Sequence, residues 1–156
     1  MTQEYAGPGN AFILRFPDDW TFDRSALQSG ELDSIVIHKT VGAIGALRLT
    51  AWAMKDGPGV AEKFIARTRK LYAKPLREEM KIYDWIPLTT GNKSGFIRAS
   101  MGTEDGIPVF ITVYVVAARK CAIMGSFVVP VARLKTTEEG TESKIVSQMI
   151  FDATLT

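Results

Sequence analysis

The sequence has few of the residues that usually carry catalysis or bind metals. Its 156 residues include one cysteine, Cys121, and one histidine, His38. A single cysteine excludes an intramolecular disulfide framework and favours a reducing compartment. A single histidine excludes a metal site built from several histidine or cysteine ligands of one chain. We therefore predict that the protein holds no metal and no cofactor.

Excess charge of one sign and long apolar runs are also missing. Lys plus Arg is 19 and Asp plus Glu is 17, so the net charge of +2 does not call for nucleic acid or an anionic membrane. The longest apolar stretch is interrupted by Arg119 and Lys120 and is too short for a spanning helix. Residues 1–10 lack the basic and apolar regions of a secretory signal. These absences predict a cytoplasmic protein with no nucleic-acid partner and no membrane insertion.

Residues 107–130 are the most β-rich part of the chain. Two runs of β-branched and aromatic residues flank a short basic turn, and a further strand precedes them over 96–101. The connection between 96–101 and 107–117 contains Asp105-Gly106, a strong hairpin signal because glycine accepts positive φ at little cost. Residues 96–129 therefore predict a three-stranded antiparallel meander.

Further strands and two helices are predicted from periodicity. Alternation of apolar and polar residues predicts strands over 10–16, 20–22, 34–39, 46–54 and 80–88. Helical spacing predicts one helix over about 60–73 and a second that begins after Thr136, which has capping-box spacing to Glu139, and ends at about Ile150. The expected fold class is α+β, a mainly antiparallel sheet of about six to seven strands with two main helices packed on it. Residues 1–9 predict a flexible lead-in to a single domain over 10–156.

The two faces of the predicted sheet differ in chemistry. Aliphatic residues such as Val113 and Val115 form one face, which the helices are expected to cover. The opposite faces carry aromatic, arginine and hydroxyl residues, which protein-binding surfaces favour. The alternative is a second core layer, and strand register decides which of these residues share a surface. The candidate partner-binding residues are Arg48, Thr50, Trp52, Phe96, Arg98, Phe110, Thr112 and Tyr114, with Tyr83 and Trp85 beside them.

Patterns for other chemistry are incomplete. Cations beside Cys121 favour a thiolate, although a packed cysteine is the more common case. Ser126 does not lie in a nucleophile elbow, and the Lys93-Ser94 turn lacks the glycine spacing of a phosphate-binding loop. Basic residues on the first helix are typical of a solvated face, with an anionic partner as the alternative. They are Lys63, Arg67, Lys70 and Lys74.

Three pieces of the chain carry a pattern of a known superfamily. The first is the apolar strand from Phe12 that ends in Pro17 and an acidic pair before Trp20. The second is the glycine-marked turn at 91–95, and the third is the segment 122–127 followed by the terminal helix. Together they resemble the PsbP-like superfamily, which includes DcrB-like proteins and a Ran-binding transport factor. The resemblance implies an antiparallel sheet with helices against it and mostly binding functions. It implies no site that maps onto this chain residue by residue.

The sequence therefore favours a non-enzymatic protein-binding, adaptor or chaperone-like domain, whose partner is another protein or a second copy of the chain. Two alternatives remain open at this point. One is a carrier of a small apolar ligand between sheet and helix, and the other is an enzyme that uses Cys121.

Overall fold

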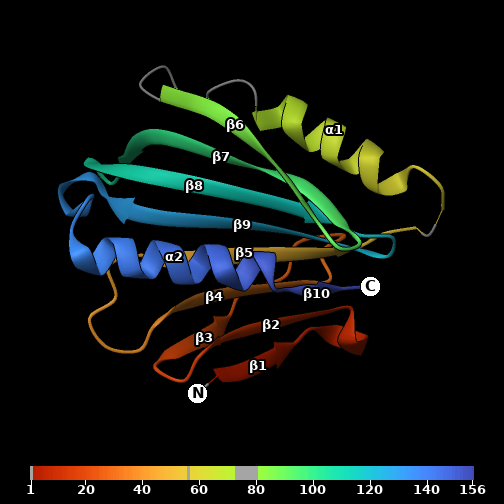
Figure 1. Ribbon diagram of the computed structural model, residues 1–156, viewed down its shortest axis with the longest axis horizontal. Coiled ribbons are helices and arrows are strands. Elements are labelled where there is room, and N and C mark those ends of the chain that lie inside the picture. The colour runs from red at the N-terminus through yellow and green to blue at the C-terminus, as the bar shows by residue number, and fades with distance from the viewer. Residues whose placement is uncertain (1, 56, 73–80) are drawn as a thin grey trace.

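The fold consists of two antiparallel sheets and two main helices (Figure 1). The computed structural model describes residues 2–55, 57–72 and 81–156, and within these it describes the side chains of all but 81–85 and 90. The predicted α+β class is confirmed, since a seven-stranded antiparallel sheet with helices against it is the main feature.

The large sheet contains every predicted strand except the first. Its strands are β3 (Trp20–Arg24), β4 (Asp33–Lys39), β5 (Ala46–Ala53), β6 (Lys81–Thr90), β7 (Lys93–Glu104), β8 (Ile107–Ala117) and β9 (Cys121–Pro130). Their order across the sheet is β3-β4-β5-β9-β8-β7-β6. The adjacent strands β7, β8 and β9 confirm the predicted meander. Asp105 and Gly106 both have positive φ, 51° and 78°, as a two-residue hairpin turn requires.

The small sheet brings both ends of the chain together. Its strands β1 (Thr2–Ala6), β2 (Phe12–Pro17) and β10 (Thr154–Leu155) lie in the order β1-β2-β10. The sequence predicts a flexible lead-in over residues 1–9, but the structure places 2–6 in β1 and 8–10 in a short 3-10 helix, η1 (Pro8–Asn10). Tyr5 holds this strand in place because its ring is buried and its hydroxyl donates a hydrogen bond to the Asp33 carboxylate on the large sheet.

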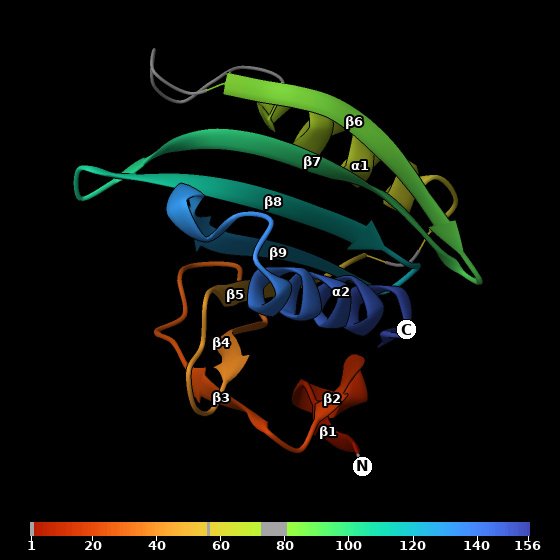
Figure 2. The ribbon, with the colours of Figure 1, turned by 60° about the vertical axis from the view of Figure 1, so that its left-hand side comes forward.

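The two helices lie on opposite faces of the large sheet (Figures 1 and 2). Helix α2 (Thr137–Phe151) follows a second short 3-10 helix, η2 (Val131–Arg133), and begins with the predicted cap, since the Thr136 side chain accepts a hydrogen bond from the Glu139 N–H at 3.2 Å. Together with the small sheet, α2 covers one face and closes the larger core.

Helix α1 (Val60–Tyr72) covers the other face only in part. It packs mainly on β7 and β8, where Phe96, Val113 and Val115 form a second, smaller core with Phe64 and Ile65. Strands β4, β5 and β9 lie beyond the helix on this face, as Figure 2 shows. The described residues therefore close one face of the large sheet and leave the other half open.

Candidate functional site

Strand register divides the predicted partner-binding residues between the two faces. On β7 and β8, Arg98 pairs with Val113 and Phe96 pairs with Val115, so even positions of β7 lie beside odd positions of β8. The expectation that all these residues face one surface is therefore wrong, because the two-residue turn fixes this register. The face of α1 carries Arg48, Thr50, Trp52, Phe96 and Arg98, and the face of α2 carries Phe110, Thr112 and Tyr114.

Two residues on the α1 face are buried beneath the helix. Phe96 is part of the smaller core. Arg98 extends under the end of α1, where its Nη1 donates to the Tyr72 carbonyl oxygen at 2.5 Å and its guanidinium lies 4.9 Å from the centre of the Tyr72 ring. Burial lowers the pKa of the Arg98 guanidinium, although the nearby Tyr72 opposes this. Arg98 and Phe96 thus hold α1 on the sheet.

The residues on the α2 face belong to the interior. The Tyr114 hydroxyl lies 3.0 Å from the Ser147 hydroxyl on α2, and burial raises the pKa of Tyr114. Phe110 packs against the larger core, and Thr112 is half-buried on the same strand. The side chains of Tyr83 and Trp85, and the whole of Lys74, lie outside the described residues.

The remaining three candidates lie on the uncovered part of the α1 face. Arg48 is exposed, and Thr50 and Trp52 are half-buried. The register pairs Arg48 with Ser126 and Thr50 with Met124 of β9, and Val128 comes next along the same face of β9. These three residues of β9 are half-buried as well. We call these residues the open strip: Arg48, Thr50, Trp52, Met124, Ser126 and Val128.

An apolar pocket lies where the open strip meets α1. It has a volume of about 390 Å³. The Trp52 and Phe64 rings are 6.0 Å apart, and the Thr68 hydroxyl donates to the Phe64 carbonyl oxygen at 2.8 Å, so it is already bonded within the helix. We call this the α1–β5 pocket, and its lining residues are Trp52, Phe64, Thr68, Leu71, Tyr72 and Met124.

Sequence reasoning found only Trp52 among these residues. Phe64, Thr68 and Leu71 follow helical spacing, a pattern that predicts a core-facing stripe. Only part of that stripe reaches the core, since Leu71 is 74% exposed. Leu71 and the pocket beside it therefore form an exposed apolar edge of α1, which helical spacing alone does not distinguish from a core-facing stripe.

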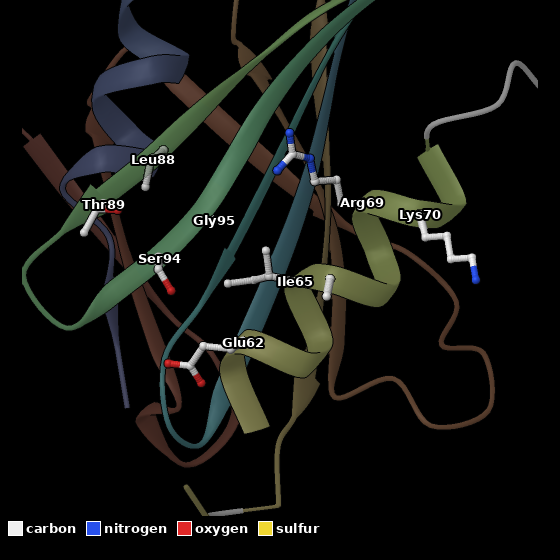
Figure 3. Close-up of a pocket in the computed structure, with 9 residues that line it drawn as sticks. Glu62, Ile65, Arg69, Lys70, Leu88, Thr89, Ser94 and Gly95 are labelled. Atoms are coloured by element: carbon white, nitrogen blue, oxygen red, sulfur yellow. The ribbon is translucent and has the colours of Figure 1, made fainter. Parts of the chain in front are cut away.

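A second groove lies on the other side of α1, between the helix and strands β6 and β7. Its volume is about 550 Å³. Figure 3 shows Glu62 and Ile65 extending from α1 toward β7 and Ser94, whereas Lys70 points away from the gap. The lining mixes a carboxylate, hydroxyls and Arg69, so its chemistry is less uniform than that of the α1–β5 pocket.

The lysine of the glycine-rich turn has a structural role. Lys93 is buried, and its Nζ donates to the Phe151 carbonyl oxygen at 2.7 Å and to that of Ala153. Burial lowers the pKa of Lys93. Because its ammonium group caps the C-terminal end of α2, this lysine is not placed to contact a phosphate in the groove beside α1.

The single cysteine and the single histidine are far from forming a dyad. Cys121 is fully buried on the α2 face, and burial raises the pKa of its thiol to about 11. His38 is on the α1 face, where its Nδ1 lies 2.8 Å from the Lys39 carbonyl oxygen and its Nε2 lies 3.5 Å from an Asp23 carboxylate oxygen. Within the described residues, no group of three or more His, Cys, Asp or Glu side chains is arranged to hold a metal ion. Over the same part of the chain, no helix combines the length and the apolar character needed to span a membrane.

The sequence matches no protein-family model and no curated protein. The fold is nevertheless similar to several solved structures. A protein from Bacteroides thetaiotaomicron VPI-5482 is 16% identical, with a TM-score of 0.67, and covers 99% of this chain, which spans 48% of that longer chain.

Two further structures match along nearly the whole length of both chains. The cyanobacterial PsbP protein of Synechocystis sp. PCC 6803 is 9% identical with a TM-score of 0.58, and the match covers 99% of this chain and 92% of that one. The Saccharomyces cerevisiae Ran-binding protein Mog1p is 10% identical with a TM-score of 0.56, over 99% and 95% of the two chains. The predicted resemblance to the PsbP-like superfamily is confirmed at the level of the fold.

Proposed function

We propose that this protein is a non-enzymatic binding protein that holds a partner polypeptide on the open strip. The proposal rests on one observation: the two faces of the large sheet are covered to different extents. One face is closed by α2 and the small sheet, whereas the other presents Arg48, Thr50 and Trp52 beside an apolar pocket. Tryptophan, arginine and methionine side chains of this kind are enriched at the centres of protein interfaces.

Two further observations support a role in binding. The thiol of Cys121 is buried, so it stays protonated at neutral pH and has no histidine beside it. Among proteins of similar fold, the yeast protein Mog1p is described as Ran-binding. Fold alone does not transfer that partner to this chain, but a binding protein of similar fold supports the proposal.

Site-specific photo-crosslinking in the source cells tests the proposal. A p-benzoylphenylalanine replaces Thr50 on the open strip, and a second protein carries it in place of Gln148, which is exposed on α2. We expect a discrete crosslinked polypeptide from position 50 only, and its loss when Trp52→Ala is added. A product of twice the chain mass would identify the partner as a second copy. Equal products from both positions, or none from position 50, would contradict the proposal.

A second function is favoured by the α1–β5 pocket itself. Its volume of about 390 Å³ and its lining by Trp52, Phe64 and Met124 suit a carrier of a small apolar ligand held between sheet and helix. Native mass spectrometry of protein purified from its source separates the two functions. A bound small-molecule mass that disappears in a Phe64→Ser variant supports the carrier, and a co-purified polypeptide supports the binding protein.

A further inference from the structure

The open strip and the α1–β5 pocket form one continuous surface. We call the pocket its deep end and the rest of the open strip, along β5 and β9, its track. Trp52 and Met124 belong to both, so the pocket opens directly onto the strip. Arg48 lies four residues before Trp52 on the same face of β5, which places it roughly 13 Å along the strand. An occupant of this surface therefore has one buried end and a short extended part.

The deep end is bordered by positive charge. Arg67 comes three residues after Phe64 and four before Leu71, so it lies on the same side of α1 as these pocket residues. Lys63 is one turn earlier on the helix, and both cations are exposed. In the part of the chain that the structure describes, Lys63, Arg67 and Arg48 make no ion pair. Their charges are available to an occupant.

Nearby described carboxylates do not neutralise this end. Glu62 lines the groove on the opposite side of α1, whereas Glu104 and Asp105 line a cavity at the far end of the strip, together with His38 and Arg48. The described residues that line the α1–β5 pocket include no acidic side chain. A ligand that complements the deep end therefore carries a negative charge beside an apolar group.

The track favours a polypeptide over an aliphatic chain. On the track, Thr50 of β5 lies diagonally across from Ser126 of β9, since Thr50 pairs with Met124 and Ser126 pairs with Arg48. Both side chains are half-buried hydroxyls that can donate to and accept from the amide groups of an extended segment. A hydrocarbon lying on the track would cover these hydroxyls without bonding to them, which costs free energy.

We propose that this surface binds an acidic segment of another protein that carries one bulky apolar residue. The inference rests on the proposed function and names the chemistry of the partner. The apolar side chain enters the α1–β5 pocket between Trp52 and Phe64. Carboxylates beside it pair with Arg67 and Lys63, and the segment continues along β5 toward Arg48.

Fluorescence anisotropy with synthetic peptides tests this inference on the full chain. The probe is a labelled seven-residue peptide in which phenylalanine is flanked by glutamates. Matched peptides replace the phenylalanine by serine or every glutamate by lysine. We expect the acidic peptide to bind, at least a tenfold loss without the phenylalanine, and no binding of the lysine peptide. The affinity should fall as salt rises from about 50 mM to about 500 mM, because the charges are exposed.

Matched variants locate the site. Arg67→Glu and Leu71→Ser should each weaken the acidic peptide at least tenfold, since one reverses a charge and the other removes a wall of the pocket. Both residues are exposed, so the variants should keep the wild-type circular dichroism spectrum and unfolding midpoint. The control is Lys144→Glu on α2, on the opposite face of the sheet, which should bind as wild type.

The outcomes separate this inference from the function on which it rests. Equal binding of the acidic and lysine peptides, or equal loss in the Lys144→Glu control, would overturn it. Binding of dodecanoate at the same pocket without binding of the acidic peptide would overturn it in favour of a lipid-like ligand. If no peptide binds but position 50 still crosslinks to a partner, the partner chemistry is wrong and the binding function stands.

Discussion

At the scale of single residues, burial decides what each candidate can do. Arg48, Phe96 and Tyr114 have similar places in a strand pattern, yet Arg48 is exposed, Phe96 lies beneath α1 and Tyr114 contacts α2. Cys121 shows the same dependence, because the neighbouring cations Arg119 and Lys120 are exposed while its own thiol is enclosed. Arg119 and Lys120 lie in the turn between β8 and β9, whereas Cys121 is the first residue of β9, so these sequence neighbours do not share an environment.

The buried thiol predicts low reactivity. Because burial raises the pKa of Cys121 to about 11, almost none of it is thiolate at neutral pH, and access is closed as well. We expect iodoacetamide to label the native protein at pH 7.5 far more slowly than the urea-unfolded protein, as followed by intact mass. Comparable rates in the two states would show that the thiol is accessible and would revive the enzyme hypothesis.

Two aspartate substitutions in the smaller core should differ in cost. Val115→Asp places a charge between Phe96 and Met124, and we expect it to lower the free energy of unfolding by about 3 kcal/mol or more. Val113→Asp should cost less because Arg98 lies directly across the strand pair, roughly 5 Å away between Cβ atoms. Urea unfolding measures both, and an equal or larger loss for Val113→Asp would contradict the assigned register.

At the scale of elements, two buried charges fix α2. Lys93 caps its C-terminal end through the carbonyl oxygens of Phe151 and Ala153. The buried Glu142 carboxylate accepts hydrogen bonds from the N–H groups of Ile44 and Gly45, with its nearest oxygen 2.8 Å from the Ile44 nitrogen. These contacts tie one helix to the β6–β7 turn and to the connection between β4 and β5.

Removal of the Lys93 cap should destabilise the protein. Lys93→Met keeps the length of the side chain but leaves two carbonyl groups without their charged donor, which we expect to cost about 2 kcal/mol in the free energy of unfolding. Lys144→Met, an exposed lysine on the same helix, serves as the control and should change stability little. If urea unfolding gives equal values for the two variants, the cap contributes nothing.

At the scale of the whole molecule, the chain ends close the larger core. Strand β1 and strand β10 flank β2, so the first and last described segments meet in one small sheet that packs against α2 and the large sheet. The Tyr5–Asp33 hydrogen bond joins the two sheets directly. Truncation of residues 2–6 therefore removes part of the core as well as a strand.

Alkaline pH should weaken this junction. Burial, reinforced by the hydrogen bond to Asp33, raises the pKa of Tyr5 to about 12, above the value of 10.0 for a free tyrosine. The stability that Tyr5 contributes is therefore fully present below pH 10 and is lost as pH rises toward 12. We expect the difference in free energy of unfolding between wild type and Tyr5→Phe to shrink from pH 9 to pH 12. A constant difference would show that Tyr5 is not linked to Asp33 in solution.

The sequence by itself determined β2, the strands of the large sheet, the two main helices and the fold class, because alternation, helical spacing and the Asp105-Gly106 turn are local. The same turn implies the pairing of Phe96 with Val115, so this part of the register could also have been read from the sequence. The tertiary structure alone decided that residues 2–6 and 154–155 form strands and that α1 covers mainly β7 and β8. The position of a helix on a sheet depends on contacts between distant segments, and no local pattern records which strands are left open. The binding surface that we propose lies in that uncovered part.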